Sequence, residues 1–121
     1  MNKLTIIGNL TKDPEKRTTT SGVNVCSFSV AVNKPKRDGQ DQGADFFRVT
    51  AWRGLADICG KYLAKGRKVA VVGSVSLHIY QSNGETKASM EVNADDVEFL
   101  TPKGDGMTPI NDPDDPFGGL N

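Results

Sequence analysis

The hydrophobic period of this chain changes twice, from strand-like alternation to helical spacing and back again. Alternating apolar residues predict five strands, which cover residues 3–10, 25–33, 45–53, 67–80 and 87–99. Between the third and fourth strands, residues 54–65 predict an amphipathic helix that ends at Gly66. Three strands, a helix and two strands are typical of an OB-fold, here expected as a five-stranded antiparallel barrel. The predicted fold class is therefore all-β with one helix.

Each predicted element has one apolar face. The fourth strand is expected to turn inward Val69, Val71, Gly73, Val75, Leu77 and Ile79, and the fifth Ala88, Met90, Val92 and Ala94. The helix is expected to bury Leu55, Ile58, Cys59, Tyr62 and Leu63. Residues 11–22 and 34–43 are polar and contain turn signals, so both are expected to be connections without regular structure.

Charge and composition divide the chain into two parts. Residues 1–103 hold all 15 Lys and Arg and 11 of the 15 Asp and Glu, a balance of +4, whereas residues 104–121 hold four Asp and no cation. The basic part suggests an anionic partner. Four Pro and four Gly among the last twenty residues predict disorder there. We therefore expect one domain over residues 1–101 and a disordered acidic tail over residues 102–121.

Several classes of protein do not fit this sequence. No run of 18 apolar residues is present, so a membrane span is not expected. The two cysteines, Cys26 and Cys59, lack metal-ligand spacing and are expected to be buried thiols. His78 is the single histidine, and no hydrolase motif accompanies it. We expect a cytoplasmic protein that is not an enzyme and has no catalytic residue, metal or cofactor.

The third predicted strand carries the most informative side chains. Its inward face holds Phe47, Val49 and Ala51, so Phe46, Arg48 and Trp52 are expected on the solvent face. Bases can stack on exposed rings while a guanidinium meets phosphate, and Tyr80 can add a third ring. The preceding loop is expected to contact phosphates through Lys34, Lys36 and Arg37. The alternative is that Phe46 and Trp52 pack in the core or cover an oligomer contact.

Six segments extend this interpretation: Asn2–Pro14 (NKLTIIGNLTKDP), Ser21–Val23, Phe28–Asn33, Asp45–Val49 with Trp52, Tyr62–Gly66 and Val71–Ser74. In this order they resemble the bacterial single-stranded DNA-binding protein family over residues 1–100. The resemblance implies sequence-independent binding and protection of single-stranded DNA in DNA replication, recombination and repair. It also implies a homo-oligomer, usually a tetramer, and bound DNA whose bases stack on Phe46, Trp52 and Tyr80. Its implied phosphate contacts include Lys3, Arg48 and Lys65, and Lys36 stands where some members carry a further aromatic residue.

The end of the tail resembles the acidic tip of that family, which docks onto replication and repair proteins. The residues that carry this resemblance are Asp112, Asp114, Asp115, Pro116 and Phe117. The family usually ends at the phenylalanine, whereas residues 118–121 follow Phe117 here. The alternative is a solubilising tail that competes with DNA for the basic domain.

A second hypothesis comes from a different class of protein. The barrel can instead be an OB-fold protein-interaction module of the replication machinery, of the primosome accessory type, with weak nucleic-acid binding. Phe46 and Trp52 would then be interface residues. The sequence also leaves DNA and RNA undistinguished, because aromatic platforms stack the bases of both. A nucleoid-associated location in the cytoplasm is expected from the first hypothesis.

Overall fold

The structure is a computed structural model that describes residues 1–101, in which six strands and one helix are found. The strands are β1 (Lys3–Leu10), β2 (Glu15–Thr18), β3 (Asn24–Asn33), β4 (Ala44–Trp52), β5 (Lys68–Ser82) and β6 (Glu85–Phe99). The helix α1 (Arg53–Tyr62) connects β4 to β5. The predicted tail over residues 102–121, with its acidic tip, lies outside the described residues.

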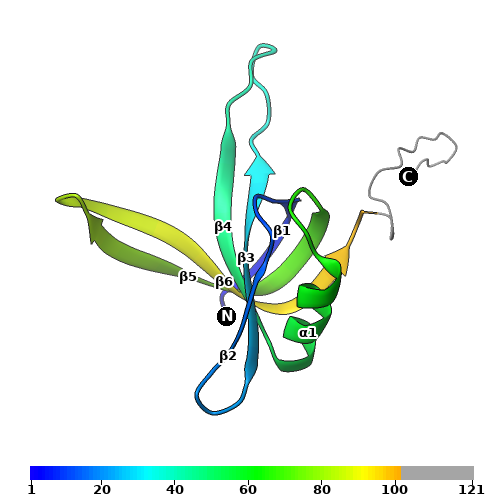
Figure 1. Cartoon of the computed structure of the whole chain (residues 1–121). Coiled ribbons are helices and arrows are strands. Elements are labelled where there is room, and N and C mark those ends of the chain that lie inside the picture. Colours follow the sequence, from blue (N-terminus) through cyan, green and yellow to red (C-terminus); the bar gives the residue numbers. More distant parts are fainter. Residues whose placement is uncertain (102–121) are drawn as a thin grey trace, which may run out of the picture.

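Five of the strands close into a barrel (Figure 1). They are hydrogen-bonded in the order β1-β5-β6-β4-β3, and β1 returns to β3 where Asn9 pairs with Ala31 and Leu10 with Val30. β2 pairs with the other half of the same β3 edge, so it lies outside the ring. The predicted five-stranded barrel with one helix is confirmed.

Two features of this sheet correct the sequence prediction. β4 and β6 are parallel where Phe47–Thr50 pair with Met90–Asn93. A closed ring of five strands cannot alternate in direction all the way round, so at least one neighbouring pair must be parallel. β2 lies inside the segment 11–22 that was predicted as a connection, and all four of its residues are exposed. Because nothing in β2 is buried, its sequence has no apolar alternation to indicate a strand.

Valine side chains fill the interior of the barrel. The fully buried side chains of the core include those of Val30, Val49, Val69, Val71, Val92, Cys26 and Cys59. β-branched residues favour strands because their stiff side chains pack well on a pleated surface. Ala56 and Cys59 of α1 and Leu63 after it belong to the same core, so the helix packs against the barrel. The composition of the strands therefore suits both their conformation and their burial.

Two glycines allow close contacts between strands. A Cβ on Gly8 would lie 2.3 Å from the carbonyl oxygen of Ala31, where β1 closes the barrel on β3. A Cβ on Gly73 would lie 2.2 Å from the carbonyl oxygen of Asn93. The β5–β6 register shifts between Val72 and Gly73, which marks a β-bulge. A bulge bends the strand and increases its twist, which is what a closing barrel requires.

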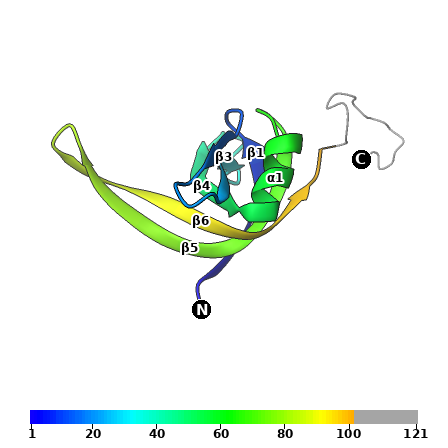
Figure 2. The same cartoon turned by 60° about the horizontal axis from the view of Figure 1, so that its bottom comes forward.

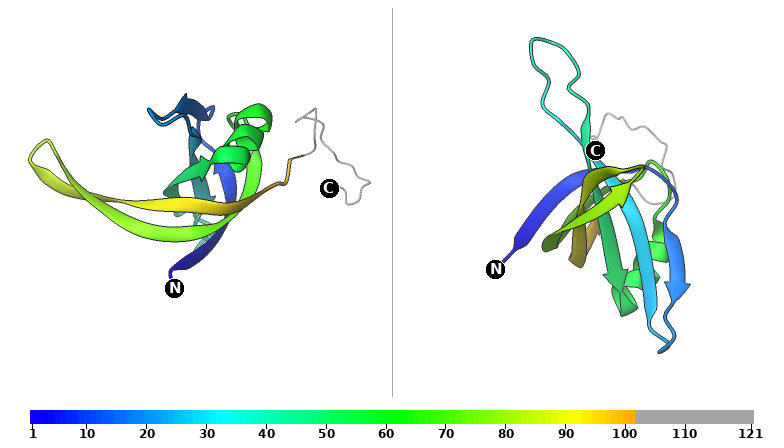
Figure 3. Two further views of the ribbon diagram at one scale, coloured as in Figure 1. Left: turned by 90° about the horizontal axis from the view of Figure 1, so that it is seen from below. Right: turned by 90° about the vertical axis from the view of Figure 1, so that its left-hand side faces the viewer.

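The β5–β6 hairpin continues beyond the barrel as a curved arm, on the opposite side of the molecule from α1 (Figures 1 and 2). This corrects the predicted burial of Leu77 and Ile79, whose side chains are 58% and 61% exposed, and of Ala88, which pairs with Ile79. These side chains lie on the same side of their strands as the core residues, but the barrel ends before these positions. Figure 3 shows the arm from two further directions, with the β3–β4 connection projecting separately.

The helix ends earlier than predicted. α1 stops at Tyr62, and Leu63 is already extended, with its side chain in the core. The backbone N–H of Lys65 donates to Asp13 Oδ1 at 2.8 Å, and that of Gly66 donates to the Leu10 carbonyl at 2.9 Å. These tertiary hydrogen bonds replace another helical turn. Ile58 and Tyr62 lie at the edge of the helix and are partly exposed rather than buried.

Candidate nucleic-acid interface

The outward side chains of four neighbouring strands form one continuous surface. Paired residues in a sheet point to the same side, and the pairs Ser29–Arg48, Arg48–Glu91 and Glu91–Ser76 link β3, β4, β6 and β5 in one row. Alternation along each strand then extends this side of the sheet. We call it the aromatic face; it comprises Ser27 and Ser29 of β3, Phe46, Arg48, Thr50 and Trp52 of β4, Glu91 and Asn93 of β6, and Ser74, Ser76, His78 and Tyr80 of β5.

The aromatic face carries the three rings that were singled out from the sequence. Phe46 is 63% exposed, Trp52 43% and Tyr80 40%. The prediction that β4 turns Phe46 and Trp52 to solvent is confirmed, and the alternative that they belong to the core is wrong. The indole Nε1–H of Trp52 donates to Asn93 Oδ1 at 3.3 Å, which orients the ring on the sheet. Exposed rings held in fixed orientations can serve as stacking platforms for bases.

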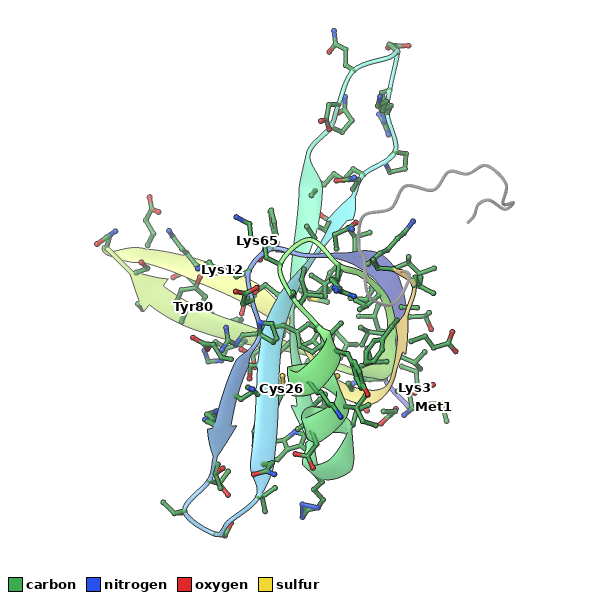
Figure 4. The ribbon with its side chains drawn as sticks, turned by 45° about the vertical axis from the view of Figure 1, so that its right-hand side comes forward. Met1, Lys3, Lys12, Cys26, Lys65 and Tyr80 are labelled. Carbon is green, nitrogen blue, oxygen red and sulfur yellow. The ribbon has the colours of Figure 1, made fainter. Side chains whose placement is uncertain are left out.

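Tyr80 lies on the arm, away from the barrel (Figure 4). His78, two residues earlier on the same side of β5, stacks on it with ring centroids 5.7 Å apart and planes 17° apart. The two rings form a wider platform than Tyr80 alone, and they pair across the hairpin with Ser89 and Lys87. The stacked pair was not identified from the sequence, because it depends on the side-chain geometry of the arm.

Three predicted phosphate-binding cations are held in exposed ion pairs. Arg48 lies 3.8 Å from Glu15 of β2, Lys34 lies 3.7 Å from Asp45, and Lys3 contacts Asp95. Lys3 pairs with Ser74, so β1 brings it to the edge of the aromatic face. Exposed ion pairs contribute only about 0–1 kcal/mol each. A phosphate can therefore replace the carboxylate partner at little cost.

The remaining predicted cations occupy two different places. Lys36 and Arg37 lie in the β3–β4 connection, where the Arg37 N–H donates to the Gln40 carbonyl at 3.2 Å in a small turn. Lys65 lies after α1 and does not belong to the aromatic face. Its backbone is hydrogen-bonded to Asp13, which lines a groove of about 110 Å³ beside Arg48. Figure 4 labels Lys65 and Lys12, whose segments meet at the hydrogen bond between Lys65 and Asp13.

Sequence reasoning missed two cations that the fold brings to this surface. Lys12 lines the groove beside Arg48 together with Ser27 and Ser29. Arg17 of β2 pairs with Val25, which pairs in turn with Trp52, so Arg17 and Trp52 share one row of the sheet. Both cations belong to the segment predicted as a connection. The register of β2 against β3, which leaves no apolar signal in the sequence, reveals Arg17, and the groove beside Arg48 reveals Lys12.

The two cysteines and the side chains that can ligate metals are the other candidates for chemistry in the described residues. Burial raises the pKa of the Cys26 thiol, and burial together with the neighbouring Cys26 raises the pKa of Cys59 to about 12. Both thiols therefore stay protonated and behave as small apolar side chains, as predicted. Over residues 1–101, no group of three or more His, Cys, Asp or Glu side chains is arranged to hold a metal ion. Within the same range, no helix has the length and hydropathy to cross a membrane.

A family comparison now adds to this geometry. The model of the Single-strand binding protein family matches residues 1–100. The chain belongs to this family. The match covers the whole barrel, both hairpins that project from it and all of the aromatic face. It therefore confirms the family resemblance seen in the sequence.

Individual relatives agree with the family match. The chain is 43% identical over 114 residues to the single-stranded DNA-binding protein of Caldanaerobacter subterraneus subsp. tengcongensis, covering 90% of this chain and 76% of the relative. It is 39% identical over 110 residues to that of Staphylococcus aureus, covering 89% and 70%. Its fold is similar to a small single-stranded DNA-binding protein from Streptomyces coelicolor, with a TM-score of 0.73, 26% identity and coverage of 80% and 92%. The OB-fold prediction is thereby confirmed.

Proposed function

We propose that this protein binds single-stranded DNA without regard to sequence and protects it during DNA replication, recombination and repair. The observation that carries the proposal is the aromatic face, on which β4 and β5 present three exposed rings together with Arg48, and Lys3 lies at its edge. The family to which the chain belongs supports the same function. The proposed activity is binding without catalysis, in the cytoplasm and in association with the nucleoid.

Base stacking and phosphate contacts supply the affinity in this proposal. Phe46, Trp52 and Tyr80 each stack on a base, which contributes about 1–3 kcal/mol per base. The proposed phosphate contacts are Lys3, Lys34, Lys36, Arg37, Arg48 and Lys65, to which the register of the sheet adds Arg17. Neither type of contact reads base identity, because every base has a π-face and phosphates carry no sequence.

Self-association is a further part of the proposal. One OB-fold covers only about 4–16 nucleotides, so several copies are needed to wrap a longer strand. The arm presents Leu77 and Ile79, both more than half exposed, and β1 presents Ile7, which is 53% exposed. Exposed aliphatic side chains of this kind favour contacts between copies of the chain. We propose a homotetramer, as the family resemblance implies.

The acidic tail supplies the proposed contact with other replication and repair proteins. Phe117 would enter an apolar pocket on the partner while Asp112, Asp114, Asp115 and Pro116 direct it to a basic surface. These residues lie outside the described range. The chemistry of the sequence, an aromatic anchor preceded by three carboxylates, supports this part of the proposal.

Titration of the Trp52 fluorescence with a dT oligomer tests the proposed function. We expect strong quenching by single-stranded DNA and little quenching by duplex DNA. Binding should weaken as salt rises, because lysines and arginines of the protein displace counterions from the DNA phosphates and this release is less favourable at high salt. A matching RNA oligomer measures the preference between the two nucleic acids. If single strands leave the fluorescence unchanged at low salt, the interaction-module hypothesis replaces this one.

A further inference from the structure

A groove of about 430 Å³ lies between β2 and α1, on the side of the β2–β3 hairpin that faces the helix. Residues of the hairpin form one wall and residues of the helix form the other; Figure 1 labels both elements. Its lining residues are Lys16, Arg17, Thr18, Asn24, Val25, Ala56, Asp57, Gly60 and Lys61. The groove therefore contains three cations and one carboxylate.

The arrangement of charge in this groove favours an anion. Within residues 1–101, none of the three ion pairs includes Lys16, Arg17 or Lys61. The single carboxylate, Asp57, already accepts a hydrogen bond from Asn24 Nδ2 at 2.9 Å. The Lys61 ammonium lies 5.3 Å from the centre of the Tyr62 ring, an attraction that is weak at an exposed site. These cations are thus available to a polyanion.

The helix sequence makes room for one of these cations. Gly60 has no side chain, and a Cβ there would lie 2.4 Å from Cδ of Lys16. The aliphatic stem of Lys16 therefore lies against the helix at Gly60. A lysine packed in this way keeps its charged end toward water while its methylene groups cover the surface below. The groove has a defined cation on each wall, Lys16 on β2 and Lys61 on α1.

The groove and the aromatic face lie on the two sides of the β2–β3 hairpin. Lys16 pairs with Cys26, which pairs with Ala51 of the core, so Lys16 is on the side that faces α1. Arg17 pairs with Val25, which pairs with Trp52; neighbouring strands are about 4.8 Å apart, so Arg17 lies about 10 Å from the Trp52 backbone on the side of the aromatic face. Because β2 is the edge strand of the sheet, a strand that stacks a base on Trp52 meets Arg17 next and reaches the groove at Lys16 by crossing this edge.

We infer that this groove binds the phosphodiester backbone of single-stranded DNA as the strand leaves Trp52, with Lys16 and Lys61 as its phosphate contacts. The inference rests on the proposed function and extends the bound strand beyond the aromatic face. It assigns a role to β2, whose four residues are all exposed and which supplies part of one wall of the groove. The ligand is a single-stranded polyanion, because the strand that enters the groove is the one that stacks its bases on the aromatic face.

The variants Lys16→Gln and Lys61→Gln test this inference, with Lys68→Gln as the matched control. Glutamine keeps most of the side chain and removes the charge. Lys68 lines a different pocket, with Tyr62, Leu63, Arg67, Phe99 and Thr101, and lies six residues before Ser74 on β5, about 20 Å along the strand. Thermal melting of each variant confirms that the chain is folded before binding is measured.

The readout is the affinity for a dT oligomer several times longer than one OB-fold covers, measured from Trp52 quenching across a range of salt concentrations. Each groove variant is expected to lower the slope of log K against log salt by about 0.7, the value for one phosphate contact on a single strand. The ratio of the wild-type binding constant to that of each variant should therefore fall about 2.6-fold when salt rises fourfold. The double variant should lose about twice that slope, and Lys68→Gln should keep the wild-type slope.

Two results would overturn the inference in different ways. If the wild type binds the oligomer and both groove variants keep the wild-type salt slope, the groove does not bind DNA, and the proposed function still stands. The same holds if Lys68→Gln loses as much slope as the groove variants, because the effect would then reflect net charge alone. A wild type that does not bind single strands would overturn the proposed function and the groove together.

Discussion

Replacing Phe46 with alanine is the sharpest test of the stacking platform. Phe46 is the most exposed of the three rings, and its replacement leaves Trp52 intact as the fluorescent reporter. Loss of one stacked base should cost about 1–3 kcal/mol of binding free energy. The dissociation constant for a dT oligomer is therefore expected to rise about 5- to 150-fold at fixed salt.

The fold should tolerate this change. An aromatic side chain buries about 150–250 Å² when it is fully enclosed. Because Phe46 is 63% exposed, the protein covers little more than a third of that area. At about 25 cal/mol per Å² the truncation costs about 2 kcal/mol of folding free energy at most. Domains of this size have about 5–15 kcal/mol of stability, so the variant remains folded.

The assay is a fluorescence titration with a dT oligomer at one salt concentration, with denaturant unfolding of each variant as the control for folding. Phe99→Ala is the matched control for binding. Phe99 is also a partly exposed phenylalanine on a strand, but it contacts Tyr62 and pairs with Val69 at the end of β6 far from the arm. Wild-type affinity in Phe46→Ala, or an equal loss in Phe99→Ala, would refute the assignment of Phe46 as a stacking residue.

Three further predictions concern the fold. Arg53 has φ of 59°, a conformation that glycine adopts without strain, so Arg53→Gly is expected to stabilise the protein by about 1 kcal/mol, measured as a higher melting temperature. Gly8→Ala should destabilise it by about 1–3 kcal/mol in denaturant because the new Cβ meets the backbone of β3, whereas Gly54→Ala, in open space on α1, should be neutral or stabilising. The pKa of Cys59 is raised to about 12 in the fold, so its contribution to stability is complete below the unfolded value of 9.0 and is lost as pH rises toward 12. Denaturant unfolding at pH 8 and at a pH of about 10 should show a larger loss in the wild type than in Cys59→Ala; an equal loss would contradict this.

Much of the site could be predicted from the sequence because β-strand parity is local. Phe47, Val49 and Ala51 are apolar, so Phe46 and Trp52 had to face the other side of β4, and both are exposed. The same reasoning predicted that Leu77 and Ile79 are buried, and this was wrong. Alternation indicates that residues share one side of a strand, but where the barrel ends and the arm begins depends on the partners of that strand.

Cations were harder to place than aromatic residues. Lys12 and Arg17 belong to a polar segment in which no apolar pattern exists, and only the pairing of β2 with β3 brings Arg17 into the row of Trp52. Conversely, Lys65 was expected at the binding surface, and it lies after α1, beside Asp13. An exposed charged side chain contributes little to folding free energy at any one surface position. The residues around it in the sequence therefore say little about where on the surface it lies.

The sequence by itself determined the order of the elements, the inward and outward sides of the central strands, and the three exposed rings. These follow from side-chain period and from the free energy of burying apolar groups, both of which are readable residue by residue. Only the tertiary structure decided the parallel β4–β6 pair, the strand β2, the length of α1, and the groove between β2 and α1. Those features arise from ring closure, from pairing between strands distant in sequence, and from the hydrogen bonds of Lys65 with Asp13 and of Gly66 with Leu10. They are properties of contacts between segments, which no single segment encodes.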